Sequence, residues 1–445
     1  MTPVPLSDKE LEELLNEPLF RKKPGFLAKK FFEIRDYFYL AGNKVARSHD
    51  LELGKNLVSL SFKMQKAGSE YFPLKGKISF LLSHPHIHPW LASLGHIGFN
   101  IDMLIKSMIL GVIPDSKVIL LAPPNEVCNH TFLKYWEKYI TILKDNATIQ
   151  KLYPKARFHE NWPYSLLYHK IQDEVMWMNK SFASVQNRWE EENRKPLLEI
   201  SEKDKERGYK TLQKMGIPKD AWFVCIHARE NGYHNHGKNL KNNWRNASIE
   251  SFDQAIDSIT SRGGWVIRLG DSSMSSYKKT DKFIDYANSE YKSDWMDVFL
   301  GAECKFFVAS NSGILFIPFC FGTPCVMVNT FPLYLRGFSE KDIFITKLFH
   351  SKDKYLPFQE AIKNMPFYGN HEDLDTTDLQ CIDNTPEEIN DVVVEMISRL
   401  EMKTDDTNED VSLQQKFNTF MPDYHNLTNA RIGKAFIKKW EHLLN

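Results

Sequence analysis

Residues 222–230 are the part of this chain best suited to chemistry, because an apolar run there ends on a histidine, an arginine and an acid. The run from Trp222 to Ile226 is short and apolar, which predicts a buried strand. His227 and Arg229 are separated by one residue, so both side chains project to the same side of the strand. A guanidinium donates two parallel hydrogen bonds to a phosphate or diphosphate, so this pair suits an anionic ligand. The alternative is that both are solvated loop residues.

Further polar residues follow other predicted strands, at the end of a sheet where open α/β folds bind ligands. Asn311 to Gly313 opens a helix directly after a strand, where free backbone amides and the helix dipole favour an anion. Arg229 and Arg245 can neutralise charge, while Glu230 and Asp271 can accept hydrogen bonds from a sugar or a base. The candidate ligand-binding residues are His227, Arg229, Glu230, Arg245, Asn246, Arg268, Asp271, Asn311, Ser312 and Gly313. Each of them alone could instead be a helix cap or a surface residue.

A glycine-bearing segment earlier in the chain is predicted to be a loop between a strand and a helix. Gly95 and Gly98 would let backbone amides approach a substrate, and Asn100 would lie in the same loop. His96 and Asp102 are the acid or base candidates attached to it. Either could also be purely structural.

A metal site is not expected. His84, His86 and His88 alternate in sequence, but the flanking prolines impose an extended path and no paired cysteine or aspartate lies nearby. The six cysteines form no CxxC pair, which argues against a zinc cluster or a redox pair.

Two sets of alternating strands and helices must position these residues. The first set has predicted strands at 78–82 and 118–122 around a helix at 100–111. The second has predicted strands at 222–226, 265–269, 305–309 and 325–328, with helices at 248–262, 294–302 and 314–321. Such an order predicts parallel strands with right-handed crossovers, a doubly wound α/β layout.

The chain of 445 residues is longer than one core usually fills, so we expect more than one domain. The predicted parts are a helical N-terminal extension over 1–75, a first Rossmann-like domain over 76–215, a second over 216–402, and a linker with a C-terminal helix over 403–445. Within the extension, the basic and aromatic stretch from Phe31 to Leu40 predicts either a docked helix with solvated lysines or a contact with an anionic membrane surface.

Bulk composition excludes some classes of partner. The formal net charge is zero, which argues against a broad phosphate-backbone footprint, so nucleic acid is not an expected partner. Neither a signal peptide nor an apolar run of membrane-spanning length is visible in the sequence. A reducing, cytoplasmic setting is therefore expected.

Several motifs in order resemble those of a group of glycosyltransferases from bacterial surface-polysaccharide gene clusters, over roughly residues 75 to 400. The motifs are Gly95-His96 with Asp102, Cys225 to Glu230, Trp244-Arg-Asn246, Gly263 to Asp271, Lys292 to Asp297 and Ser310 to Gly313. The His-Xaa-Arg at a strand end is also similar to that of fucosyltransferases with the GT-B fold, in which the arginine contacts the donor diphosphate.

This resemblance implies a GT-B type α/β fold, with two Rossmann-like domains facing across a cleft. Carried over to this chain, Arg229 binds the donor pyrophosphate, His227 lies beside it, and Ser312 and Gly313 form the phosphate-binding helix start. Those fucosyltransferases carry Gly-Asp or Thr-Asp soon after the arginine, whereas Glu-Asn-Gly-Tyr follows here, which argues against GDP-fucose. Another GDP-sugar is one candidate donor.

The expected function is therefore transfer of a sugar from a nucleotide-activated donor to a carbohydrate or glycolipid acceptor, in surface polysaccharide or glycan biosynthesis. We expect an inverting and metal-independent reaction without a cofactor, at or near the inner face of a membrane, with Asp102 or His96 as the base. The alternatives are an epimerase-like enzyme of nucleotide sugars and a non-catalytic nucleotide-binding protein.

Overall fold

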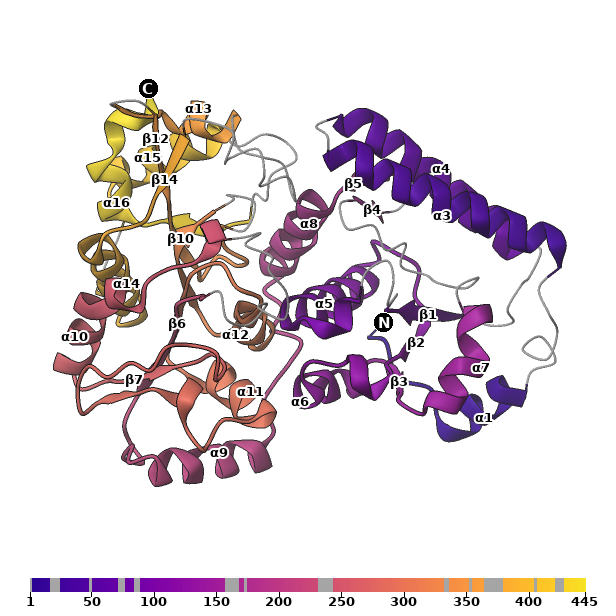
Figure 1. Ribbon diagram of the computed structural model, residues 1–445, viewed down its shortest axis with the longest axis horizontal. Coiled ribbons are helices and arrows are strands. Elements are labelled where there is room, and N and C mark those ends of the chain that lie inside the picture. Colours follow the sequence, from indigo (N-terminus) through magenta and orange to yellow (C-terminus); the bar gives the residue numbers. More distant parts are fainter. Residues whose placement is uncertain are drawn as a thin grey trace. The chain divides into compact units, whose positions relative to one another are not determined.

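The structure is a computed structural model with two compact units (Figure 1). It describes residues 2–16, 25–47, 50–70, 77–83, 89–156, 168–171, 174–230, 243–331, 336–351, 354–363, 379–403, 406–420 and 428–445. The described residues up to Val185 form unit 1, and those from Gln186 onward form unit 2.

Unit 1 is built on a three-stranded parallel sheet in the order β1-β2-β3. The strands are β1 (Ile78–Leu82), β2 (Lys117–Leu121) and β3 (Thr141–Leu143). All but the first residue of β1 and β2 are buried, because a parallel sheet is covered on both faces. Helices α1 (Asp8–Asn16) and α7 (Asn146–Ala156) contribute Leu14 and Leu152 to the core around Phe80 and Ile119.

The predicted loop at 94–102 is wrong, because the segment forms the first turns of helix α5 (Leu94–Ile109). Every residue from Ile97 to Met108 is buried, so this helix is packed on all sides. A glycine costs a helix about 1 kcal/mol relative to alanine, and burial of the apolar side chains outweighs that cost here. The end of the predicted helix is confirmed by Gly111, whose φ of 67° belongs to the left-handed region typical of helix ends.

The predicted N-terminal helices are confirmed by α3 (Phe26–Arg47) and α4 (Leu51–Glu70), which pack against each other as a hairpin. Glycines allow the close approach, since a Cβ on Gly42 would lie 2.8 Å from the backbone oxygen of Gly54. Helix α4 also contacts the antiparallel pair β4 (Tyr168–Ile171) and β5 (Glu174–Trp177). Among the described residues of unit 1, the remaining α-helices are α6 (His130–Lys134) and the start of α8 (Met178–Glu191).

Unit 2 contains a seven-stranded sheet in the order β15-β11-β10-β9-β6-β7-β8, in which all neighbours are parallel. Its strands are β6 (Phe223–His227), β7 (Trp265–Arg268), β8 (Phe283–Ile284), β9 (Phe307–Ala309), β10 (Cys325–Thr330), β11 (Ile343–Thr346) and β15 (Arg431–Ile432). The predicted α/β class with parallel strands is therefore confirmed.

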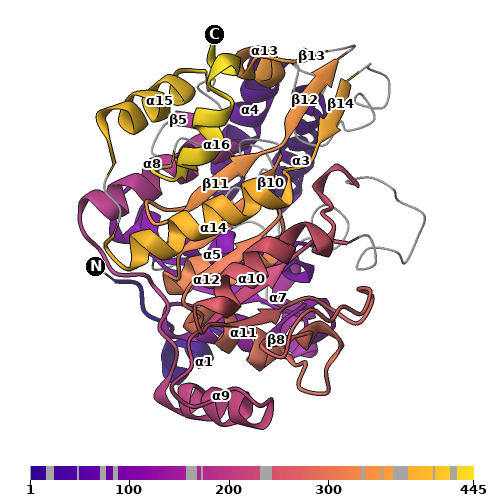
Figure 2. The same cartoon turned by 90° about the vertical axis from the view of Figure 1, so that its left-hand side faces the viewer.

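Helices cover both faces of this sheet, with α10 and α14 on one side and α11 and α12 on the other (Figures 1 and 2). The helices of unit 2 after α8 are α9 (Glu202–Lys214), α10 (Asp253–Ser261), α11 (Asp294–Glu303), α12 (Phe316–Phe321), α13 (Phe358–Lys363), α14 (Pro386–Leu400), α15 (Asn408–Thr419) and α16 (Lys434–Lys439). A small antiparallel sheet in the order β13-β12-β14 comprises β12 (Leu348–Ser351), β13 (Lys354–Tyr355) and β14 (Leu379–Ile382).

The units divide within α8, whereas the sequence placed the domain boundary at 215/216. Helix α9 lies with unit 2 because its Tyr209 hydroxyl donates a hydrogen bond to Glu303 of α11, at 3.0 Å. The predicted C-terminal part over 403–445 supplies α15, α16 and the edge strand β15 of the large sheet. Within the described ranges, no helix combines the length and apolar character that a membrane span requires.

Candidate functional site

The topological switch point of the large sheet lies between β6 and β9. From β6 the chain continues outward to β7 and β8, and it then returns to β9 on the other side of β6. Strands β6 and β9 are paired in parallel through His227 and Ala309, so the segments that follow them emerge side by side. Open α/β sheets bind ligands outside the carboxyl ends of strands at such a point.

His227 ends β6 and is held as a neutral imidazole. It is 8% exposed, and its Nδ1 lies 3.0 Å from the backbone oxygen of Leu269. A carbonyl oxygen only accepts, so Nδ1 carries the proton and Nε2 keeps a lone pair. Burial lowers the pKa of His227 to about 4, and the charges of Arg229 and Arg268 act in the same direction. In the described part of the chain, Nε2 is buried and has no hydrogen-bond partner.

Arg229 is half-buried and fixed through both its backbone and its side chain. Its backbone N–H donates to the Ser310 hydroxyl at 3.0 Å, which links the ends of β6 and β9. Its guanidinium donates a hydrogen bond to the side-chain oxygen of Asn246. Burial, and then the charge of Arg245, lowers the pKa of Arg229 to about 10, so the group stays cationic at neutral pH. Two guanidinium groups therefore lie close enough to repel each other at the switch point.

Arg245 is tied to the same edge of the sheet from the 3-10 turn at Asn243–Arg245. Its Nε donates to the backbone oxygen of Asn311 at 3.1 Å. The buried Asn311 side chain donates in turn to the backbone oxygen of Phe331 after β10, at 2.8 Å. These hydrogen bonds hold Arg229 and Arg245 at the carboxyl ends of β6 and β9.

The predicted helix start after β9 is present. Ser312 has an extended backbone and precedes a 3-10 turn, Gly313–Leu315, that leads directly into α12. The Ser312 side chain makes no capping hydrogen bond. The first amides of a helix have no partner within it, and they can bind an anion.

Arg268 and Glu230 were predicted to bind a ligand, but in the structure they bind each other. The Arg268 side chain is fully buried, and its Nη1 also donates to the backbone oxygen of Ser275 at 2.6 Å. Glu230 accepts a hydrogen bond from the Ser275 amide at 3.0 Å. This network holds the loop after β7, where Asp271 accepts a hydrogen bond from the Ser273 amide at 2.8 Å. Asp271 stays near the site, since its charge acts on the pKa of His227.

Lys347 is a residue of this edge that the sequence analysis missed. It follows β11, is buried, forms an ion pair with Asp383, and donates to the backbone oxygen of Asn246 at 3.3 Å. The side-chain oxygen of Asn246 accepts a hydrogen bond from Arg229. Lys347 therefore binds the backbone of the same residue that contacts Arg229. The available signal was the short apolar run Ile343 to Ile345, which ends on the polar residues Thr346 and Lys347, a pattern similar to that at the end of β6.

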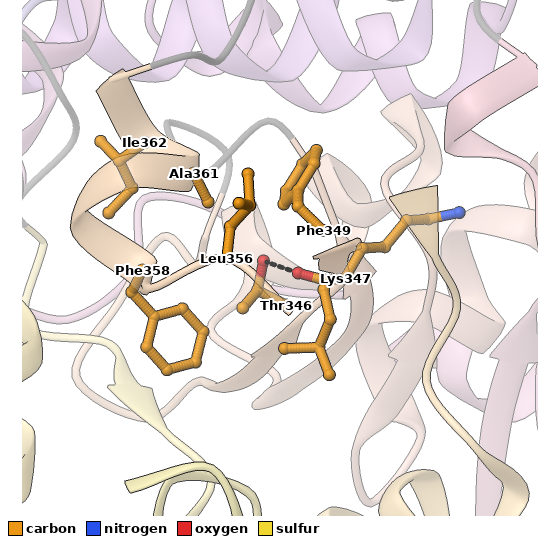
Figure 3. Close-up of a pocket in the computed structure, with 8 residues that line it drawn as sticks. Thr346, Lys347, Phe349, Leu356, Phe358, Ala361 and Ile362 are labelled. Carbon is orange, nitrogen blue, oxygen red and sulfur yellow. Dashed lines mark hydrogen bonds between the residues drawn. The ribbon is translucent and has the colours of Figure 1, made fainter. Parts of the chain in front are cut away.

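A small and mainly apolar pocket has Lys347 in its lining (Figure 3). It is lined by Thr346, Lys347, Leu348, Phe349, Leu356, Phe358, Ala361 and Ile362. Figure 3 shows the Lys347 amino group extending away from these side chains. The Thr346 hydroxyl donates to the backbone oxygen of Thr330 at 2.8 Å, so it is already used in holding β10 and β11 together.

In unit 1, the predicted acceptor residues Gly95, Gly98 and Asn100 are buried within α5. Asp102 is 1% exposed and forms an ion pair with Lys106, one turn further along, at 2.7 Å. Burial raises the pKa of Asp102, and the charge of Lys106 opposes this rise. His96 lies on the first turn of α5 and is partly buried, with some exposed surface. Of the two acid or base candidates, His96 is therefore the one with accessible surface.

No group of three or more His, Cys, Asp or Glu side chains that could hold a metal ion occurs in the described ranges. His84, His86 and His88 lie outside these ranges. None of the six cysteines forms a disulfide, and burial raises the pKa of the Cys225 and Cys325 thiols, which disfavours the reactive thiolate.

Comparisons with known proteins give weak structural likeness only. No protein-family model matches the chain, and no curated protein matches it. The ADP-heptose lipopolysaccharide heptosyltransferase II of Escherichia coli is 12% identical, with a TM-score of 0.43 over 74% of this chain and 99% of that one.

A glycosyl transferase family 9 protein of Veillonella parvula is 11% identical, with a TM-score of 0.42 over 74% of this chain and 97% of that one. The iron-containing dodecameric glycosyltransferase TibC of enterotoxigenic Escherichia coli is 12% identical, with a TM-score of 0.34 over 73% of this chain and 76% of that one. Similarity at this level assigns neither an activity nor a substrate to this chain.

Proposed function

We propose that unit 2 binds the diphosphate of a nucleotide-activated sugar at its switch point, and that the protein is a glycosyltransferase of the GT-B type. The observation that supports this most is the pair of neighbouring guanidinium groups, Arg229 and Arg245, fixed over the ends of β6 and β9. Holding two like charges together costs free energy, and a bound anion removes that cost.

In the proposed reaction, an acceptor hydroxyl displaces the nucleoside diphosphate directly, which inverts the sugar carbon. The bond from that carbon to the diphosphate oxygen breaks, and negative charge develops on the leaving group. Arg229, Arg245 and the first amides after Ser312 would stabilise this charge. Since cationic side chains can do this without a metal ion, we propose a metal-independent reaction.

A base must take the proton of the acceptor hydroxyl, and it must come within hydrogen-bond reach of that proton. We propose His96 for this role, because it lies on the first turn of α5 and has some exposed surface. Asp102 is the other candidate, but its carboxylate is buried in the ion pair with Lys106. The acceptor would be a carbohydrate or glycolipid, as in surface polysaccharide biosynthesis.

His227 would contact the donor nucleotide at a group other than phosphate. An ionised phosphate carries no proton to donate, and the Nε2 of a neutral His227 can only accept. The matching groups on a nucleotide are the ribose hydroxyls and the N–H groups of the base. Arg268 and Glu230 would act as positioning residues, since they hold the neighbouring loop and bind each other.

A thermal-shift panel of nucleoside mono- and diphosphates tests the donor site. We expect one diphosphate to stabilise the wild type, by about 2.7 kcal/mol at a hundred times its Kd. At the same concentration, Arg229→Ala should lower this stabilisation to about 1.4 kcal/mol or less, as a tenfold or larger loss of affinity requires. Arg262→Ala, which changes an exposed arginine at the end of α10, should leave it unchanged.

Equal shifts for the wild type and Arg229→Ala would refute the assignment of Arg229. If no nucleotide shifts the wild type, the proposed donor site is wrong. Release of free nucleoside diphosphate without any acceptor would instead indicate epimerase-like chemistry.

A further inference from the structure

Exposed apolar side chains are concentrated on the α3–α4 hairpin of unit 1. Of the eleven large apolar residues exposed in the described part of the chain, seven lie on these two helices. They are Phe26, Leu27, Ile34, Tyr37, Leu40, Leu53 and Leu60. Phe26 and Tyr37 are the most exposed of them, at 73% and 70%. Scattered exposed apolar residues are ordinary, whereas a concentration on one hairpin indicates a contact surface.

The exposed residues of α3 form one face of the helix. Phe26, Tyr37 and Leu40 follow each other at spacings of eleven and three residues, which correspond to nearly whole turns. The opposite face is the one that packs in the core of the hairpin, where Ala28 and Phe32 are buried. The core of unit 1 therefore does not account for the apolar character of the outer face.

The hairpin is also basic within a chain of zero net charge. Helices α3 and α4 together carry eight lysines and arginines against four acidic residues. Lys30 and Lys44 are exposed and share the outer face of α3 with Tyr37, at seven residues on either side of it. Glu33 is also exposed on this face, seven residues after Phe26, and forms an ion pair with Lys30 at 2.5 Å, so the positive charge of the face rests chiefly on Lys44.

We propose that this outer face of α3, formed by Phe26, Leu27, Lys30, Ile34, Tyr37, Leu40 and Lys44, docks on an anionic membrane surface. Aromatic and aliphatic side chains would enter the region between headgroups and acyl chains, and the lysines would extend to the lipid phosphates. Basic residues are attracted to an anionic leaflet, which favours a charged lipid surface over a neutral partner. The inference does not depend on the chemistry of unit 2.

Co-sedimentation of the full chain with vesicles tests this directly, using phosphatidylcholine vesicles with and without phosphatidylglycerol. The wild type should bind the anionic vesicles, and binding should weaken as salt is raised. The double variant Tyr37→Ser with Leu40→Ser should bind them about tenfold more weakly, because partial insertion of both side chains is lost. Lys30→Gln with Lys44→Gln should reduce the preference for anionic over neutral vesicles, also about tenfold.

A matched control is Met402→Ser with Val411→Ser, which removes two exposed apolar side chains from unit 2 and should bind as the wild type does. Thermal unfolding and the nucleotide-induced shift of each variant show whether its fold and donor site are intact. The proposal is overturned if the wild type ignores anionic vesicles, or if the Tyr37 and Leu40 variant binds them normally. A wild-type dimer that becomes monomeric in this variant, without vesicle binding, would assign the face to a second copy of the chain instead.

Discussion

At the scale of single residues, the candidate site combines cationic groups with one neutral acceptor. Arg229 is fixed by Ser310 and Asn246, while His227 is kept uncharged by burial. The sequence predicted His227 and Arg229 together because both follow the apolar run from Trp222 to Ile226. It could not predict that Arg268 and Glu230 pair with each other, since that contact joins the ends of β6 and β7 and depends on their register.

The neutral state of His227 has a consequence for stability against pH. Its pKa is about 4 in the folded protein against an ordinary value of 6.5, so the unfolded chain binds the proton first as pH falls. The contribution of His227 to stability is present above pH 6.5 and is lost as pH falls toward 4. Between pH 7 and pH 5, the unfolding free energy of the wild type should fall by about 2 kcal/mol more than that of His227→Gln.

Urea unfolding at both pH values measures this difference. His169 is also buried with a lowered pKa and acts in the same direction, but it is present in both proteins and cancels in the comparison. Parallel pH dependence in the wild type and His227→Gln would show that His227 takes up a proton equally well in the folded and unfolded states.

At the scale of elements, strands were predictable and one helix start was not. Short apolar runs bounded by turn residues identified β1, β2, β6, β7, β9 and β10. The glycines of α5 suggested a loop, because glycine usually interrupts a helix. Burial on all sides of α5 stabilises the helical form, and no local pattern reveals such burial. The short strand β11 was overlooked, and Lys347 was overlooked with it.

Asp102 and Lys106 form a buried ion pair in helix α5. Variants that remove this pair show whether Asp102 has a structural or a catalytic role. Lys106→Met leaves the Asp102 carboxylate buried without its partner, which should cost about 3–5 kcal/mol. The double variant Asp102→Leu with Lys106→Met should recover much of that stability. Chemical denaturation of the two variants and the wild type measures both effects.

A catalytic Asp102 predicts a different result. In that case the double variant would be stable but inactive in a transfer assay, whereas a structural role predicts that it keeps its activity. The single variant Asp102→Leu completes the comparison: if its loss of stability and that of Lys106→Met simply add up to the loss in the double variant, the ion pair itself is contradicted.

Strand β11 supports the site through Lys347, which follows it and donates a hydrogen bond to the backbone oxygen of Asn246. Lys347→Met removes this support, so Arg229 should bind a nucleoside diphosphate several-fold more weakly without loss of the site. The control Lys305→Met changes a lysine at the opposite end of β9, before the strand begins, and should bind normally. Isothermal titration measures both, and unchanged affinity in Lys347→Met would remove it from the site.

At the scale of the whole molecule, we assign different functions to the two units. Unit 2 would bind the donor, and unit 1 would supply the base His96 and the outer face of α3 that docks on a membrane. Hydrogen exchange of the full chain can show this separation. A nucleoside diphosphate should slow exchange of the amides at 227–230 and 312–315, where the ends of β6 and β9 meet. Exchange in α3 and α4 should not change. Protection confined to unit 1 would contradict the proposed division.

Isothermal titration shows most directly whether Arg229 and Arg245 bind the diphosphate. Nucleoside, nucleoside monophosphate and nucleoside diphosphate are each titrated into the wild type and into the Arg229→Ala and Arg245→Ala variants. Affinity should rise with each phosphate in the wild type. Each variant should lose about tenfold or more of its affinity for the diphosphate while keeping the weak affinity for the nucleoside. Diphosphate affinity that is equal in all three proteins would contradict a site built on these two arginines.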